Sequence, residues 1–196
     1  MPVRSDDYMQ ARRDEILDAA LICINRCGIS NLSLSLICEE AKLSKGALYT
    51  HFTSKQEILL ALLRRQRPRI HDRIRFEDAA SLRRVLHELL GQIDAGRKNA
   101  ANISDMDAVV VSRNNEAILK ELRKTSRERT RVFADSFALL QARGEIRADL
   151  DAATAAMLLD VVTIGMIMHS VTQPRDIGQS YKRIVELLLE LLEVPG

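Results

Sequence analysis

Residues 33–55 read SLSLICEEAKLSKGALYTHFTSK, and this stretch contains two short helix signatures joined by a tight break. Ser33 stands where a helix N-cap is expected, and apolar residues follow it at helical spacing as far as Ala41. Ser44 is a second N-cap, and it begins another short helix over Lys45–Phe52. Two brief helices joined by a tight turn predict a helix-turn-helix, although a plain pair of packed helices in a bundle would carry the same caps.

The residues before this stretch predict another helix and a polar arm. Apolar residues recur on one face over residues 11–26, and Gly28 follows as a natural C-terminal stop, because glycine enters the left-handed region without a steric cost. The arm before that helix contains Arg4, Arg12 and Arg13. We expect the arm either to be disordered or to trail across a phosphate backbone.

The short helix over Lys45–Phe52 has apolar residues on one side and polar residues on the other. Leu48 and Phe52 are four apart and are expected to face the core, which leaves residues 49–51 to point outward. Phosphate is bound by several groups that this stretch offers: a tyrosine hydroxyl, an imidazole N–H, the Lys55 ammonium and the free N–H groups of a helix N-terminus. The pattern therefore favours a DNA-binding helix over a purely structural one.

The stretch resembles the DNA-binding domain of the TetR/AcrR family of bacterial transcriptional regulators. The shared pattern has a capped helix, a tight turn, a glycine, a Tyr-x-His-Phe run and a lysine followed by apolar residues. The matching positions are Ser33, Ile37, Ala41, Ser44, Gly46, Tyr49, His51, Phe52, Lys55 and Leu59. The strong resemblance covers residues 11–63, and beyond them only the helical architecture agrees.

The resemblance implies that each monomer places Lys45–His51 in a DNA major groove, with Lys45 and Thr50 contacting bases. The small residues 46–47 would permit close approach, and the remaining candidates, including two serine hydroxyls, would hold the phosphate backbone. For His51 a structural hydrogen bond that closes the helix is an equal alternative. The candidate DNA-binding residues are Ser33, Lys42, Ser44, Lys45, Gly46, Ala47, Tyr49, Thr50, His51 and Lys55.

Lys42 departs from the family pattern, which usually has glycine in a joint that needs a positive φ. A non-glycine residue in that conformation costs about 1 to 2 kcal/mol. Either the turn is remodelled here, or the domain tolerates the strain and Lys42 adds a phosphate contact. Cys38 replaces a usual alanine, which is a nearly isosteric change in the core.

The composition fits a globular chain of one large or two small domains. The chain has 196 residues, of which 46% are hydrophobic and 29% are charged. The net charge is only +2, but residues 1–75 contain 13 Lys and Arg against 9 Asp and Glu, a surplus of four at the opening of the chain. The four histidines are scattered and no glycine-rich phosphate loop occurs, which argues against an enzyme.

The cysteines indicate whether the protein binds a metal, and the apolar runs indicate whether it enters a membrane or is secreted. Cys23, Cys27 and Cys38 form no CxxC pair and are expected to be reduced core residues, so we predict no metal and no cofactor. Residues 1–13 lack the apolar core of a signal peptide, and the most apolar run, residues 152–168, is shorter than the roughly 20 residues that cross a bilayer. The prediction is a cytoplasmic protein without membrane contact.

The rest of the chain shows helical patterns and no alternating strand signal, so the predicted fold is all-α. We expect an N-terminal helix-turn-helix three-helix domain at residues 1–55 and a connecting helix at 54–68, ended or bent by Pro68. A C-terminal helical ligand-binding and dimerisation domain would occupy residues 69–196. The arginines between 64 and 75 would form a solvated face or extend the basic surface.

Two C-terminal helices, at about 152–170 and 177–193, are more apolar than a small monomer requires. We expect a homodimer through both of them, with burial inside a monomeric core as the alternative. Flexible methionines and aromatic residues suit an adaptable apolar pocket, although each candidate would also suit the core. The candidate ligand-binding residues are Met106, Phe133, Phe137, Met166 and His169.

The sequence thus predicts a homodimeric transcriptional repressor on a pseudo-palindromic, double-stranded DNA operator. A small-molecule effector would release the protein by binding one of its states more tightly. The alternative is a DNA-binding regulator that a protein partner controls, or that no ligand controls. Activation instead of repression also remains possible, because the sign depends on the operator position.

Overall fold

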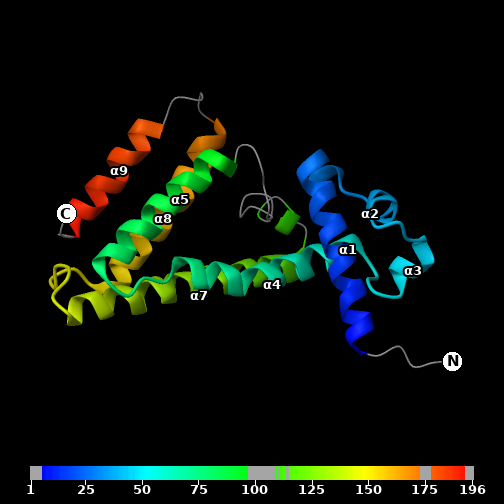
Figure 1. Cartoon of the computed structure of the whole chain (residues 1–196), viewed down its shortest axis with the longest axis horizontal. Coiled ribbons are helices and arrows are strands. Elements are labelled where there is room, and N and C mark those ends of the chain that lie inside the picture. The colour runs from blue at the N-terminus through cyan, green and yellow to red at the C-terminus, as the bar shows by residue number, and fades with distance from the viewer. Residues whose placement is uncertain (1–5, 97–108, 110, 114, 173–177, 193–196) are drawn as a thin grey trace. The chain divides into compact units, whose positions relative to one another are not determined.

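The computed structural model describes residues 6–96, 109, 111–113, 115–172 and 178–192 (Figure 1). Within these residues all regular structure is helical, which confirms the predicted all-α fold. The chain divides into two compact units, and α4 (Lys55–Ile74) and α7 (Glu116–Ala142) each contain residues of both. Unit 1 comprises residues 1–67 and 100–123, and unit 2 comprises residues 68–99 and 124–196.

Unit 1 contains three N-terminal helices and the first part of a fourth (Figure 1). The helix α1 begins earlier than the sequence suggested, so Arg12 and Arg13 lie on a helix and not on an arm. Gly28 ends α1 at a φ of 80°, and its N–H donates to the Ile24 carbonyl at 2.7 Å. The elements are α1 (Asp6–Cys27), a 3-10 turn (Ile29–Asn31), α2 (Leu34–Glu40), α3 (Lys45–Tyr49) and α4 (Lys55–Ile74).

The core of unit 1 is made by the apolar faces of these helices. Ile37 of α2 and Leu48 of α3 are both 0% exposed, so each short helix is held by a buried anchor. Short helices are marginal alone, and packing of this kind supplies most of their stability. The other fully covered members are Ile16, Ala20, Cys23, Phe52, Ile58 and Leu62.

The helix α4 continues through Pro68 to Ile74, so the predicted end at the proline was wrong. Proline removes one backbone donor and crowds the preceding turn. Buried apolar residues on both sides of it, Leu62 and Ile74, offset that loss by fixing α4 before and after the proline.

Unit 2 is a helical body built around three phenylalanines. The Phe76 ring meets Phe137 edge-on at 5.0 Å between centroids and stacks with Phe133 at 6.3 Å. The helix α5 packs against both α8 and α9 (Figure 1). The helices of unit 2 are α5 (Ala79–Gly96), the later part of α7 (Glu116–Ala142), α8 (Ala152–Thr172) and α9 (Gly178–Leu191).

The apolar helix α8 is long enough to cross a membrane by length and composition, contrary to the expectation from residues 152–168. Core helices pass the same test, and α8 has the contacts of one. Ala156 and Leu159 belong to the buried core of unit 2, and the Asp160 carboxylate pairs with the Arg129 guanidinium of α7. These contacts hold one face of α8 against the core of unit 2, while only 33% of its apolar span is buried.

Candidate DNA-binding surface

The two predicted serine caps are both present. The Ser33 hydroxyl accepts a hydrogen bond from the Leu36 N–H at 3.2 Å, and the Ser44 hydroxyl accepts one from the Ala47 N–H at 3.1 Å. Each hydroxyl thereby satisfies one of the free donors at the start of its helix. The caps fix where α2 and α3 begin, and so fix which side chains α3 exposes.

The helix α3 ends at Tyr49, three residues before the predicted end at Phe52. The chain tightens there, because the His51 and Phe52 N–H groups both donate to the Leu48 carbonyl, at 2.9 and 3.0 Å. The Thr50 hydroxyl also donates back to the Ala47 carbonyl at 2.7 Å. This bond uses the hydroxyl hydrogen of Thr50 within the turn and leaves the oxygen lone pairs as acceptors.

The joint between α2 and α3 keeps the left-handed conformation despite its lysine. Lys42 has a φ of 53° and is the one non-glycine residue with positive φ in the described part of the chain. The Leu43 N–H donates to the Cys38 carbonyl at 2.9 Å, which is the long-range bond of a Schellman motif. The turn is thus not remodelled, and the domain tolerates the strain.

We expect Lys42→Gly to stabilise the protein by about 1 kcal/mol, because glycine adopts this φ without strain. For a chain of this size the melting temperature would rise by roughly 2 to 4 °C in calorimetry. Lys42→Ala is the matched control, since it removes the same ammonium but keeps the Cβ. An equal gain in both variants would mean that the charge, and not the backbone strain, limits stability.

Most of the candidate DNA-binding residues are exposed, on α3 or at the residues that flank it. Leu48 and Phe52 are completely covered, as predicted, whereas Tyr49 is 52% exposed. The other exposed candidates are Ser33, Lys42, Ser44, Lys45, Gly46 and Thr50, with Ala47 half-buried. The sequence pattern therefore separated the inward from the outward side of this helix correctly, except at one position.

That exception is His51, which is buried at 8% exposure and does not point outward as predicted. Its backbone carbonyl accepts a hydrogen bond from the Arg13 guanidinium of α1. Lys55 is half-buried, and its ammonium donates to the Leu32 carbonyl at 2.9 Å. Both residues thus have internal contacts, and a phosphate contact from either stays a prediction.

Several α4 arginines have acidic partners inside unit 1. Arg64 and Arg67 both pair with the Glu121 carboxylate of α7, at 3.1 and 2.6 Å. Arg65 pairs with Asp18 of α1 at 2.8 Å. Arg65 and Arg67 are thus largely covered and paired, whereas the side chain of Arg64 is paired but stays 60% exposed. Sequence reasoning missed the pairs because the partners lie far away in the chain.

The predicted ligand-binding residues lie mainly in the core of unit 2. Phe133, Phe137 and Met166 are all buried at 4% exposure or less. The His169 Nδ1 atom lies 3.0 Å from the Tyr181 hydroxyl, which donates to the Met166 carbonyl at 3.1 Å. Met106 falls outside the described residues.

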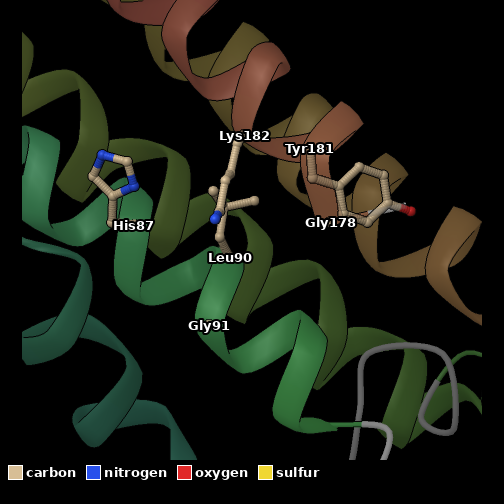
Figure 2. A pocket seen from close by; sticks show the side chains of 6 residues that line it. All are labelled: His87, Leu90, Gly91, Gly178, Tyr181 and Lys182. Atoms are coloured by element: carbon tan, nitrogen blue, oxygen red, sulfur yellow. The ribbon is translucent and has the colours of Figure 1, made fainter. Parts of the chain in front are cut away.

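Unit 2 also contains a cavity of about 150 Å³ between α5 and α9 (Figure 2). Figure 2 shows Lys182 reaching from α9 toward Leu90 of α5. None of the predicted ligand-binding residues that the structure describes lines this cavity. Its lining residues are His87, Leu90, Gly91, Gly178, Tyr181 and Lys182.

Comparison with known proteins agrees with this architecture. Residues 16–62 match the family described as bacterial regulatory proteins of the tetR family. The chain is 28% identical over 167 residues to the HTH-type transcriptional regulator UidR of Escherichia coli K12, covering 81% of each protein. It is 42% identical over 50 residues to the nicotine-responsive repressor HdnoR of Paenarthrobacter nicotinovorans, covering 26% of each.

A solved structure shows the same fold over nearly the whole chain. A transcriptional regulator from Saccharomonospora viridis, in complex with choline, superposes with a TM-score of 0.75. It covers 92% of this chain and 96% of its own, at 23% sequence identity. The match of residues 16–62 to the tetR family and the likeness to UidR over 81% of both proteins show that the chain is a DNA-binding transcriptional regulator of the TetR family, and the capped helices, the left-handed joint and the exposed face of α3 agree with it.

Proposed function

We propose that the protein is a homodimeric repressor that leaves its operator when a small molecule binds unit 2. The observation that carries the DNA-binding part of the proposal is the exposed face of α3. The helix is capped by Ser44, anchored in the core by Leu48, and ends at the exposed Tyr49. In this proposal Lys45 and Thr50 contact bases, and the serines, Lys42, Tyr49, His51 and Lys55 hold the phosphate backbone. Repression is supported by HdnoR, a named repressor. DNA binding in a bacterium also implies the cytoplasm.

Dimerisation is supported by exposed apolar stripes on α8 and α9. Met157 and Val161 of α8 are 62% and 61% exposed, and Leu187 and Leu191 of α9 are 47% and 44% exposed. Each pair is spaced by four residues and so lies on one face of its helix. Exposed apolar surface of this kind marks an interaction site, and a two-fold axis would cover both stripes with their own copies.

Val161→Asp is expected to convert the dimer into a monomer, because a charge at the centre of an apolar interface has no partner there. Light scattering would report a fall from twice 22.1 kDa to 22.1 kDa. Ala138→Asp, which places the same charge on the exposed side of α7, should leave the mass unchanged. A wild-type protein of only 22.1 kDa at micromolar concentration would contradict the dimer.

Release by a small molecule is supported by two similar proteins. HdnoR is named as nicotine-responsive, and the S. viridis regulator was solved with choline. A thermal-shift screen against a metabolite library tests this directly, since a true effector raises the melting temperature with concentration. Operator titrations with and without a hit then measure release. Hits that never weaken operator binding, or an absence of hits, would favour control by a protein partner or by no ligand.

A further inference from the structure

We infer that Arg13 of α1 is a positioning residue for sequence-specific DNA binding, because it holds the turn that follows α3. This turn, residues 50–54, joins α3 to α4 and lies between Tyr49, which is exposed, and Lys55, which is half-buried. Arg13 belongs to none of the candidate DNA-binding positions. It acts on recognition through the turn, and the test below needs neither a dimer nor an effector.

One guanidinium group contacts three different parts of the turn and of the helix after it. Its Nη1 atom donates to the His51 carbonyl, and its carbon atom lies 4.1 Å from the centroid of the Phe52 ring. Its Nη2 atom lies 3.7 Å from the Glu57 carboxylate of α4. A planar group with several fixed donors is suited to this combination of stacking and hydrogen bonding, whereas an ammonium is not.

Glu57 extends the same network to the middle of the turn. Its carboxylate accepts hydrogen bonds from the Thr53 N–H at 2.7 Å and from the Thr53 hydroxyl at 2.9 Å. These bonds to Thr53, followed by the charge of Arg13, hold the pKa of Glu57 below its ordinary value. The carboxylate is therefore ionised at neutral pH and keeps its attraction for Arg13.

The base of the network is rigid, whereas the helix that it positions is short. Ile16 and Leu17, one turn after Arg13 on α1, are buried at 0% and 4% exposure. The helix α3 has only five residues, too few to hold its own direction without neighbours. Its direction therefore depends on the buried Leu48 and on the turn at its end, which Arg13 ties to α1.

The geometry makes a specific prediction about which DNA contacts suffer when Arg13 is lost. Hydrogen bonds to base edges need close alignment, while attraction to phosphates is long-range and independent of sequence. A loosened turn should therefore weaken binding to a preferred sequence far more than binding to an arbitrary one. A direct phosphate contact from Arg13 would instead weaken both alike.

The test compares Arg13→Ala, Arg13→Lys and the matched charge control Arg12→Ala, since Arg12 is the adjacent residue and pairs with Glu15 of the same helix. The probes are a duplex carrying the consensus that the wild-type protein enriches from a random library, and a scrambled duplex of equal length. We expect Arg13→Ala and Arg13→Lys to weaken consensus binding by about tenfold or more, the size of one lost base contact. Scrambled binding should change little, and Arg12→Ala should leave the preference for the consensus unchanged.

Equal losses on the two duplexes would overturn the inference, as would full rescue by Arg13→Lys or an equal effect of Arg12→Ala. Thermal melting of each variant shows whether it is folded. If Arg13→Ala does not fold, Glu57→Gln replaces it, because this variant keeps the shape of the side chain and removes the charge that faces Arg13. Glu57→Gln should also lose consensus binding selectively, and an unchanged ratio of the two affinities would contradict the positioning role.

Discussion

Phe52→Ala is expected to lower the free energy of unfolding by about 3 to 5 kcal/mol and to abolish sequence-specific DNA binding. The Phe52 ring is 0% exposed in the core of unit 1, and the Arg13 guanidinium lies over it. Truncation would leave a cavity directly beneath the turn that follows α3, and would remove the surface on which Arg13 rests. Stability and recognition should therefore fall together in this variant.

Urea unfolding followed by circular dichroism measures the loss of stability, and hydrogen exchange shows whether it is confined to unit 1. Tyr49→Ala is the matched control, because Tyr49 is an aromatic residue at the end of α3, three positions before Phe52, and is 52% exposed. It should change stability by less than about 0.5 kcal/mol, yet still weaken DNA binding through a lost contact. A Phe52→Ala variant with near wild-type stability would show that the buried ring does not anchor α3.

Asp160→Ala is expected to destabilise the protein by about 3 to 5 kcal/mol, because it removes the counter-charge of a largely buried guanidinium. The side chains of Arg129 and Asp160 are only 12% and 11% exposed, and they join α7 to the apolar helix α8. Replacing both residues, Arg129→Met with Asp160→Leu, should restore stability to near the wild-type value, since well-packed apolar residues often match a buried ion pair.

Asp135→Ala supplies the control for Asp160→Ala within α7. Its partner Arg131 is 83% exposed and lies 3.8 Å away. Losing this surface pair should therefore change the free energy of unfolding by less than about 0.5 kcal/mol. Chemical unfolding of these three variants and the wild-type protein separates the two cases. Equal, small losses in Asp160→Ala and Asp135→Ala would mean that water reaches the Arg129 side chain and solvates its charge.

The features that sequence reasoning predicted correctly depend on neighbours in the chain. Each serine cap involves a donor only three residues away, as in the bond from the Leu36 N–H to Ser33. At Lys42 the sequence left two outcomes open, a remodelled turn or a tolerated strain, and the φ of 53° corresponds to the second. Spacing by four residues placed Leu48 and Phe52 in the core.

The features that sequence reasoning missed depend on residues brought together by folding. Arg13 lies 38 residues from His51, and Arg67 lies 54 residues from Glu121. No periodicity connects such pairs, so these arginines looked like an arm and a solvated face. Pro68 shows the opposite failure, because a sound local rule predicted a helix end that burial of Leu62 and Ile74 overrides.

Selection of bound DNA from a random duplex library by the wild-type protein measures recognition, dimer symmetry and half-site spacing together. We expect enrichment of one inverted repeat whose half-sites are centred about one helical turn apart, or a whole multiple of it, because two α3 helices related by a two-fold axis read successive major grooves. A library that stays unenriched after repeated rounds would contradict sequence-specific binding, and enrichment of a lone half-site bound by a single chain would contradict the dimeric operator complex.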